Sequence, residues 1–361
     1  MIFLIILILL LSIPASGSGE TVPACTVSVS EYTDFGSIWL EISIDGFNAL
    51  GFRYGDSCDL VFSNGETLED VPYYNGYYCR TNAPLIVSYP GYKHPCFAFN
   101  SGDPAWEKLG CAEGDTVTVT RAEAGKYLAV QQTMDMVYSN DRADYPDDAV
   151  FANFRELKGG RLKEKAFYRG ASPVDDEYHR AGTADRLIRE AGIRFDLDLS
   201  DTEEEAAKYA ETSKPEYFLS LAEAGNVACL NLGMSYRKAE FYTPLAAGLR
   251  EMMNHDGPCY IHCVEGKDRT GIVCILLEAL AGAGGEEIAA DYMETYRNYY
   301  GITPGTEQYD AVLNIRFYDM YDWLCSLGGG TPEDGAKAYL ALAGMTEEET
   351  ERLIRYVTAA E

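Results

Sequence analysis

Alternating hydrophobic and polar residues predict a β-rich segment over residues 20–140. Four strands are expected from this alternation and from the turn residues beside it: 37–44, 59–62, 116–120 and 127–131. The pairs Asp45-Gly46 and Asn64-Gly65 are typical of hairpin turns. A Gly-Asp turn also precedes a strand twice. Repeated short strands of this kind predict a small barrel with pseudo-repeated halves.

From residue 161 to residue 361, strand patterns alternate with helical ones. Strands are expected at 192–199, 227–232 and 259–263, and helices at 182–191, 242–255, 271–280 and 286–297. Strands that alternate with helices favour an α/β layer structure around a mostly parallel sheet. Residues 141–160 begin as a polar, turn-rich stretch, and we predict that they join the two domains.

The first residues form an apolar run that ends near Ile13 and is followed by small residues. The run is shorter than the ~20 residues that a membrane-spanning helix needs. We therefore expect residues 1–19 to be a cleaved signal peptide, which predicts a secreted or cell-surface protein outside the cytoplasm. No Lys or Arg precedes the run, since the first basic residue is Arg53, so a retained membrane anchor stays as the alternative.

The composition is strongly acidic, with a formal net charge of −28. A nucleic-acid partner is excluded because the chain offers no basic stripe for phosphate backbones. The same charge repels anionic substrates at long range, so any positive potential that attracts them must be local.

Ten cysteines in an exported chain favour disulfide bonds. Four cysteines of the β-rich domain could pair, in a connectivity that spacing does not define: Cys58, Cys79, Cys96 and Cys111. Metal binding is not expected, because no spacing of the four histidines and the cysteines fits a zinc site. No cofactor is implied either.

The chemistry is concentrated in residues 259–271, where an apolar strand runs through a polar loop into an apolar helix. Such a turn directs several backbone N–H groups inward, and the helix dipole adds positive charge there. This field favours the thiolate of Cys263, which is the nucleophilic form of cysteine. Arg269 offers a planar fork for two phosphoryl oxygens. Thr270 can donate its hydroxyl to the sulfur and so make it a better leaving group.

The string from His262 to Gly271 resembles the HCxxGKDRTG loop of the bacterial tyrosine-phosphatase-like family. Segments 168–173 and 286–297 resemble that family as well. The resemblance implies a three-layer phosphatase domain over residues 161–361. It also implies that Cys263 is the nucleophile, that Arg269 binds phosphate and that Lys267 and Asp268 are the family's Lys-Asp pair. Members of the family dephosphorylate phosphotyrosine and, in several cases, phosphoinositides.

The general acid remains open between three aspartates. Asp198 matches the family's D-L-R segment, although Ser200 stands in place of the arginine. Asp201 begins the following turn, and Asp268 lies in the loop itself. We rank Asp268 and Asp198 equal and Asp201 behind them. For each, an ordinary structural aspartate is the alternative.

Substrate binding is expected from the loop residues Val264, Glu265, Gly266 and Lys267, with His262 as a supporting group that positions the loop. Lys267 accompanies phosphoinositide activity in the family, but Glu265 should disfavour polyanions, so we expect singly phosphorylated substrates to be preferred. The expected partners are phosphorylated peptides or proteins, or phosphoinositides, with membrane contact only if the leader is retained. The alternatives are a catalytically silent phosphate-binding or surface-binding protein and a rhodanese-like sulfur transferase.

The β-rich domain weakly resembles the C-terminal β-barrel domain of S-adenosylmethionine hydroxide adenosyltransferases. The catalytic domain that accompanies it there has no counterpart in this chain. We therefore interpret it as a docking or substrate-presenting module, with a nucleoside-binding module as the alternative.

Overall fold

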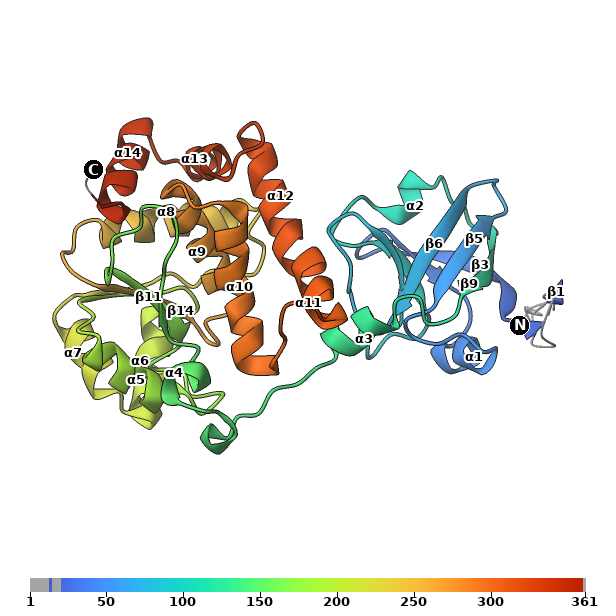
Figure 1. The fold of residues 1–361 in the computed structure, drawn as a ribbon. Helices are drawn as coiled ribbons and strands as arrows, with labels where there is room; N and C mark the ends of the chain where they lie inside the picture. Colours follow the sequence, from blue (N-terminus) through green and yellow to red (C-terminus); the bar gives the residue numbers. More distant parts are fainter. Residues whose placement is uncertain (1–12, 15–20, 360–361) are drawn as a thin grey trace. The chain divides into compact units, whose positions relative to one another are not determined.

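The computed structural model describes residues 13–14 and 21–359 (Figure 1). The expected signal peptide lies outside the described residues, apart from strand β1 (Ile13–Pro14), which pairs with β2 (Thr21–Val22). The chain forms two compact units. The barrel unit comprises the residues up to Met136 together with Gly305–Arg316, and the α/β unit comprises Val137–Pro304 and the residues from Phe317 onward. Within the described ranges, no helix has the length and apolar character needed to cross a bilayer.

Seven strands close the barrel in the order β3-β4-β8-β7-β6-β5-β9. They are β3 (Ala24–Tyr32), β4 (Ser37–Leu40), β5 (Ser57–Phe62), β6 (Thr67–Tyr74), β7 (Pro84–Val87), β8 (Cys96–Phe99) and β9 (Thr116–Glu123). Neighbouring strands are antiparallel except for β6 and β7, which are parallel. The prediction of a mixed α/β protein with an N-terminal barrel is therefore confirmed.

Alternation along the strands fills the barrel. Cys25, Val27 and Val29 of β3 are buried, while the residues between them face outward. Val27 lies opposite Val117 of β9, so apolar side chains of neighbouring strands meet inside the barrel. Burial of each such aliphatic side chain stabilises the fold by roughly 1.5–3 kcal/mol.

Two expected features of this unit are wrong. The turn predicted at Asp45-Gly46 is part of helix α1 (Ile44–Ala49), because the side chain of Ser43 caps the helix by accepting from Gly46 N. The strand predicted at 127–131 is the start of helix α3 (Leu128–Met134), which packs against α11 (Glu307–Val312) of the same unit. A short helix, α2 (Ala105–Lys108), precedes β9.

Three of the four cysteines that could pair in the β-rich domain form no disulfide bond in the structure. Cys58, Cys96 and Cys111 are free thiols. Cys58 faces the barrel interior, whereas Cys96 belongs to a separate cluster that contains Trp39, so the two side chains lie in different apolar clusters.

The α/β unit is built on a five-stranded sheet in the order β10-β11-β14-β12-β13. The strands are β10 (Arg155–Glu156), β11 (Phe167–Ala171), β12 (Phe195–Asp198), β13 (Val227–Cys229) and β14 (Cys259–Cys263). β14 pairs in parallel with β11 and with β12, β12 pairs in parallel with β13, and β10 is antiparallel to β11. All five residues of β14 are buried, which agrees with a strand covered on both faces.

Helices cover the sheet on two sides (Figure 1). One side carries α4 (Asp148–Phe151), α5 (Ala181–Glu190), α6 (Glu203–Ser213) and α7 (Glu216–Glu223). The other carries α8 (Ala239–Met252), α9 (Asp268–Leu280), α10 (Gly285–Tyr300), α12 (Tyr318–Leu327), α13 (Pro332–Leu342) and α14 (Glu347–Val357). A 3₁₀ turn (Arg142–Asp144) precedes α4, and a π-helical turn (Leu313–Phe317) follows α11. The stretch predicted as a junction, 141–160, lies within this unit.

Candidate active site

The loop that follows β14 lies at the carboxyl end of the central strand, where ligands of parallel sheets usually bind. Cys263 is the last residue of β14, and Asp268 begins α9. Val264, Glu265, Gly266 and Lys267 fill the interval, so the loop leads directly into a helix N-terminus. Cys263 is only 3% exposed. This sequence of strand, short loop and helix has the geometry of an anion-binding nest.

Gly266 is required by the shape of the loop. Its φ of +66° is in the left-handed region, and a Cβ atom there would lie 2.1 Å from the carbonyl oxygen of Gly170 on β11. No side chain fits without displacing that backbone. The glycine thus lets the loop approach the neighbouring strand closely.

A buried ionic network holds the same loop from behind. The carbonyl oxygen of Gly266 accepts hydrogen bonds from Arg169 Nη2 (3.0 Å) and from Asn153 Nδ2 (3.1 Å). Arg169 is 1% exposed and pairs with Asp291 of α10 at 2.5 Å, and Arg155 Nε pairs with the same carboxylate at 2.7 Å. Burial alone would raise the pKa of Asp291, but the two arginines outweigh it and lower that pKa.

The first turn of α9 supplies Arg269 and Thr270. Arg269 Nη1 donates to the carbonyl oxygen of Leu232 at 3.0 Å, in the connection between β13 and α8. Thr270 is fully buried, and its Oγ1 has no hydrogen-bond partner among the described residues. The hydrogen bond expected from Thr270 to the sulfur of Cys263 is therefore not formed in this structure, and that role of Thr270 stays a prediction.

Glu265 and Lys267 form an ion pair beside the loop. Lys267 Nζ lies 3.0 Å from Glu265 Oε1 and 3.8 Å from Asp268 Oδ2. Tyr138 OH donates a short hydrogen bond to Glu265 Oε1, and Tyr299 OH donates to the Glu265 carbonyl oxygen at 2.6 Å. Burial lowers the pKa of Lys267, but Asp268 and Glu265 outweigh it and raise that pKa. The ammonium is therefore charged, and it is partly neutralised within the chain.

His262 and three aspartates lie beneath the loop. His262 Nε2 lies 2.8 Å from Asp196 Oδ1, and both side chains are fully buried. Burial lowers the pKa of His262, but the charges of Asp196, Asp198 and Asp201 outweigh it and raise that pKa to about 10. These aspartates favour the protonated form of His262 beside Cys263, whereas burial also raises the pKa of Asp196. The supporting role of His262 stays a prediction.

The three candidate acids occupy different environments. Asp198 is fully buried, and its Oδ1 accepts from Ser200 N, Ser200 Oγ and Asp201 N at 2.9, 2.9 and 3.2 Å. Asp201 is 5% exposed, and burial together with the charge of Asp198 raises the pKa of its carboxyl to about 7. The Asp268 side chain is 38% exposed and stands at the start of α9.

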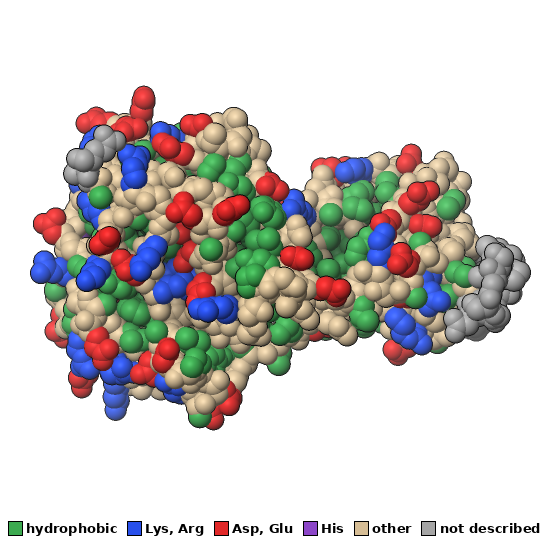
Figure 2. All heavy atoms as spheres, in the orientation of Figure 1, with side chains coloured by type: hydrophobic (Ala, Val, Ile, Leu, Met, Phe, Trp, Pro, Cys, Tyr) green, Lys and Arg blue, Asp and Glu red, His purple; other side chains and the backbone are tan. Residues whose placement is uncertain are grey.

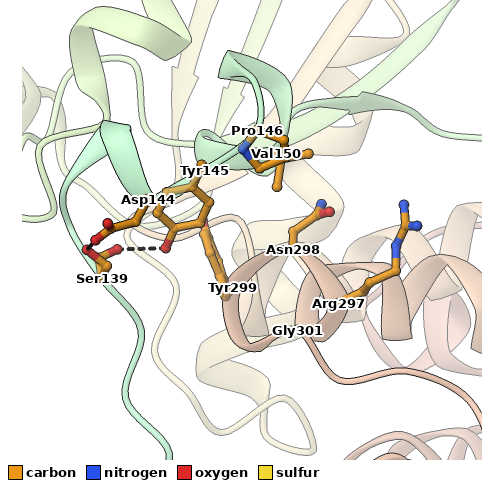
Figure 3. Close-up of a pocket in the computed structure, with 9 residues that line it drawn as sticks. All are labelled: Ser139, Asp144, Tyr145, Pro146, Val150, Arg297, Asn298, Tyr299 and Gly301. Carbon is orange, nitrogen blue, oxygen red and sulfur yellow. Dashed lines mark hydrogen bonds between the residues drawn. The ribbon is translucent and has the colours of Figure 1, made fainter.

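Tyr299, which donates to the loop at Glu265, also lines a hollow of about 410 Å³ (Figure 3). Tyr145, Pro146, Val150, Asn298 and Tyr299 are among its lining residues. Its side chains connect to the loop indirectly, because Asn298 Nδ2 donates to Asn153 Oδ1, and Asn153 holds Gly266.

The comparison with models of protein families shows which family the chain belongs to. Residues 149–358, more than half of the chain, match the model of a tyrosine phosphatase family. The chain belongs to the tyrosine phosphatase family. Members of this family are tyrosine-phosphatase-like phosphoric monoester hydrolases, and the strand, loop and helix from Cys259 to Leu280 lie within the matched residues.

The comparisons with curated proteins and with solved structures do not extend this family assignment. No curated protein matches the chain. Among solved structures, the chain is similar to an uncharacterized conserved protein from Thermotoga maritima, at 20% identity over 27% of this chain and 36% of that one, with a TM-score of 0.25. The match thus spans about a third of that protein's length. The expected resemblance of the barrel unit to an adenosyltransferase domain stays a prediction.

Sequence reasoning found the tyrosine phosphatase loop but missed most of its supports. Tyr138, Asn153 and Arg155 carry no local motif, because they reach the loop only through the fold. Arg169 and Asp291 lie in segments that resembled the family, and that resemblance was the signal in the sequence. Their pairing became visible only in the structure.

Proposed function

We propose that the protein is an exported, Cys-dependent phosphatase that hydrolyses phosphomonoesters, with phosphotyrosine as the preferred class. The main support is the placement of Cys263 at the end of β14 with Arg269 in the first turn of α9, around a loop held by buried charges. A site held this firmly before substrate arrives suits stabilisation of a phosphoryl transition state.

In the proposed reaction, the Cys263 thiolate attacks phosphorus, and the bond between phosphorus and the leaving oxygen breaks. The leaving oxygen takes a proton from an aspartic acid. Water then attacks the phosphocysteine, the aspartate accepts a proton from that water, and the S–P bond breaks to release phosphate and the thiolate. Arg269 and the loop N–H groups bind the phosphoryl oxygens in both steps.

We assign the acid to Asp268. Its carboxylate is partly exposed and lies in the loop itself, whereas Asp198 already accepts three hydrogen bonds that shape the turn after β12. The connection between β13 and α8 reaches Arg269 through Leu232, but residues 230–239 contain no Asp or Glu. Asp201 is the competitor, since a pKa of about 7 suits a group that must hold a proton near neutral pH.

Substrates whose leaving groups differ in basicity distinguish which aspartate is the general acid. Replacing the acid by Asn should lower kcat/KM for phenyl phosphate by about 10²–10⁴-fold, and much less for para-nitrophenyl phosphate, whose leaving group needs little protonation. We expect this contrast for Asp268→Asn. The same contrast in Asp201→Asn and not in Asp268→Asn would move the assignment to Asp201.

The nucleophile is tested with Cys263→Ser on para-nitrophenyl phosphate. Cys259→Ser is a matched control on the same strand, because a serine there keeps a partner in Tyr356 OH, 3.2 Å from the sulfur. Loss of hydrolysis only in Cys263→Ser supports the mechanism. Equal hydrolysis by both variants and the wild type contradicts it, and turnover of thiosulfate would favour a sulfur transferase.

A phosphoinositide phosphatase of the same mechanism is the second candidate, since Lys267 lies beside the nest. Its ion pair with Glu265 argues against polyanionic substrates. A phosphotyrosine peptide should therefore have a higher kcat/KM than a highly phosphorylated inositol. The opposite order would favour the second candidate.

A further inference from the structure

An aromatic surface covers part of the outer face of the barrel. Ile38 and Leu40 of β4 are fully buried inside the barrel, so Trp39 between them points outward. Tyr32 stacks on Trp39 with ring centroids 4.3 Å apart and planes 22° apart. Tyr92 stands edge-on to Trp39 at 5.0 Å and 87°. The three rings therefore form one continuous surface.

Two hollows adjoin this surface and share Tyr92. The first, here called the Trp39 hollow, measures about 390 Å³ and is lined by Tyr32, Trp39 and Tyr92 with Glu41, Lys93 and His94. The second, the Phe35 hollow, measures about 410 Å³ and is lined by Phe35, Tyr77 and Tyr92 among others. Phe35 is 67% exposed, although it contacts Tyr32 edge-on at 5.2 Å. The other rings are half-buried. Aromatic rings that are partly open to solvent beside a pair of hollows are typical of a binding surface.

A fixed carboxylate stands in the Trp39 hollow. Glu41 Oε1 accepts a short hydrogen bond from Ser30 Oγ, and Glu41 Oε2 lies 3.6 Å from His94 Nε2. His94 Nδ1 lies 2.9 Å from the carbonyl oxygen of Ile42, which can only accept, so Nδ1 carries a hydrogen. Glu41 is thus positioned by its neighbours before any ligand binds.

These features select between ligand classes. A cage for a methylated ammonium needs space between its rings, whereas these rings contact one another. A nucleic acid or a phosphorylated ligand needs several cations, and the Trp39 hollow offers Lys93 and His94 beside a carboxylate. A proline-rich peptide offers carbonyl oxygens, which the carboxylate of Glu41 would repel because both groups are acceptors. A sugar offers hydroxyl donors to a carboxylate and a C–H face to an aromatic ring.

We propose that this surface of the barrel unit binds a neutral oligosaccharide. One pyranose ring occupies the Trp39 hollow, where it stacks on an aromatic side chain and its hydroxyl groups donate to Glu41. The next pyranose ring occupies the Phe35 hollow, on the other side of Tyr92. Two adjoining hollows suit at least two consecutive sugar rings. The site is independent of the phosphatase reaction, and it would hold the enzyme on glycan-bearing material.

The test measures binding of four neutral tetrasaccharides to the full chain by calorimetry: β-1,4-linked glucose, β-1,4-linked N-acetylglucosamine, α-1,4-linked glucose and β-1,4-linked mannose. At least one should bind with a Kd below about 1 mM. Trp39→Ala and Glu41→Gln should each weaken binding tenfold or more, while the thermal unfolding midpoint of Glu41→Gln stays close to that of the wild type. Trp106→Phe is the matched control, because Trp106 packs against the barrel core and lines neither hollow, and it should bind as the wild type does.

Three results would overturn the proposal. These are the absence of binding by every tetrasaccharide, binding that survives both Trp39→Ala and Glu41→Gln, and tight binding of decaproline that Trp39→Ala abolishes. Cys263→Ser should bind the saccharide as the wild type does, because the readout needs no catalysis. A result that contradicts saccharide binding therefore leaves the phosphatase proposal unaffected. A result that contradicts the phosphatase reaction likewise leaves the saccharide proposal unaffected.

Discussion

At the residue scale, the burial of the Asp201 carboxyl carries a cost in stability that depends on pH. Its Oδ2 is buried without a hydrogen-bond partner among the described residues, and the pKa of its carboxyl is raised to about 7. A carboxyl whose pKa is higher in the folded state binds its proton more tightly there than in the unfolded chain. The protein therefore loses stability as pH rises from about 4 to about 7.

We predict that Asp201→Asn removes this loss. The free energy of unfolding of the wild type should fall relative to that of the variant between pH 4.5 and pH 8, by on the order of 1.4 kcal/mol for each unit of pKa shift. Urea unfolding of both proteins at the two pH values measures the difference. An equal pH dependence in the two proteins would show that Asp201 titrates normally.

Glu265 partly neutralises Lys267, and we propose that this limits the charge available to a substrate. It holds Lys267 at 3.0 Å and is itself held by Tyr138. A ligand with a second phosphate group must compete with this carboxylate for the ammonium and must also approach its negative charge.

We predict that Glu265→Gln raises kcat/KM for a doubly phosphorylated phosphoinositide, relative to a phosphotyrosine peptide, by about tenfold, because one repulsive charge is lost. Tyr138→Phe is the matched control, since it removes the hydrogen bond and leaves the charge. The ratio of the two kcat/KM values should not change in the control. A ratio unchanged in both variants would mean that Glu265 does not select substrates.

At the scale of elements, the loop depends on how closely β14 and α9 approach β11. The sequence alone predicted the strand, the loop and the helix, because apolar periodicity and the glycine are local signals. It missed the contact between Gly266 and Gly170, since spacing along the chain does not reveal which strands are neighbours. It also predicted a strand where α3 forms, because residues 127–131 alternate but pack against a helix that is distant in sequence.

We predict that Gly266→Ala lowers kcat/KM by about 100-fold or more, because the loop must move away from Gly170 and misplace the phosphate site. Gly282→Ala is the matched control: its φ is +77°, but no described atom outside its own neighbourhood lies within 4 Å of the added Cβ. That control should lose roughly 1 kcal/mol of stability and keep its kcat/KM. Steady-state kinetics and thermal unfolding of both variants test the argument, and equal kinetics would refute it.

At the scale of the whole molecule, the net charge of −28 opposes the local positive charge that we propose for the phosphate loop. Acidic side chains are spread over the visible face of both units, with Lys and Arg between them (Figure 2). Interactions between such exposed charges extend over about 30 Å at 0.01 M salt and about 8 Å at 0.15 M.

We predict that the effect of salt on catalysis changes sign with the charge of the substrate. Raising the ionic strength from 0.01 to 0.15 M should increase kcat/KM several-fold for an acidic phosphopeptide, because repulsion is screened, and decrease it for a basic one. Initial rates at low substrate concentration give both values. A decrease for both peptides would show that the local field of the loop dominates approach.

The segment Gly305–Arg316 belongs to the barrel unit, although it lies inside the stretch that matches the phosphatase family. The chain accordingly passes from one unit to the other three times, after residues 136, 304 and 316. A single cut in the chain thus cannot yield both units intact. A fragment that ends at Met136 lacks α11, which packs against α3. The segments of the barrel unit and the α/β unit therefore alternate along the chain. A protein cut or fused at residue 136 would separate Gly305–Arg316 from the rest of the barrel unit.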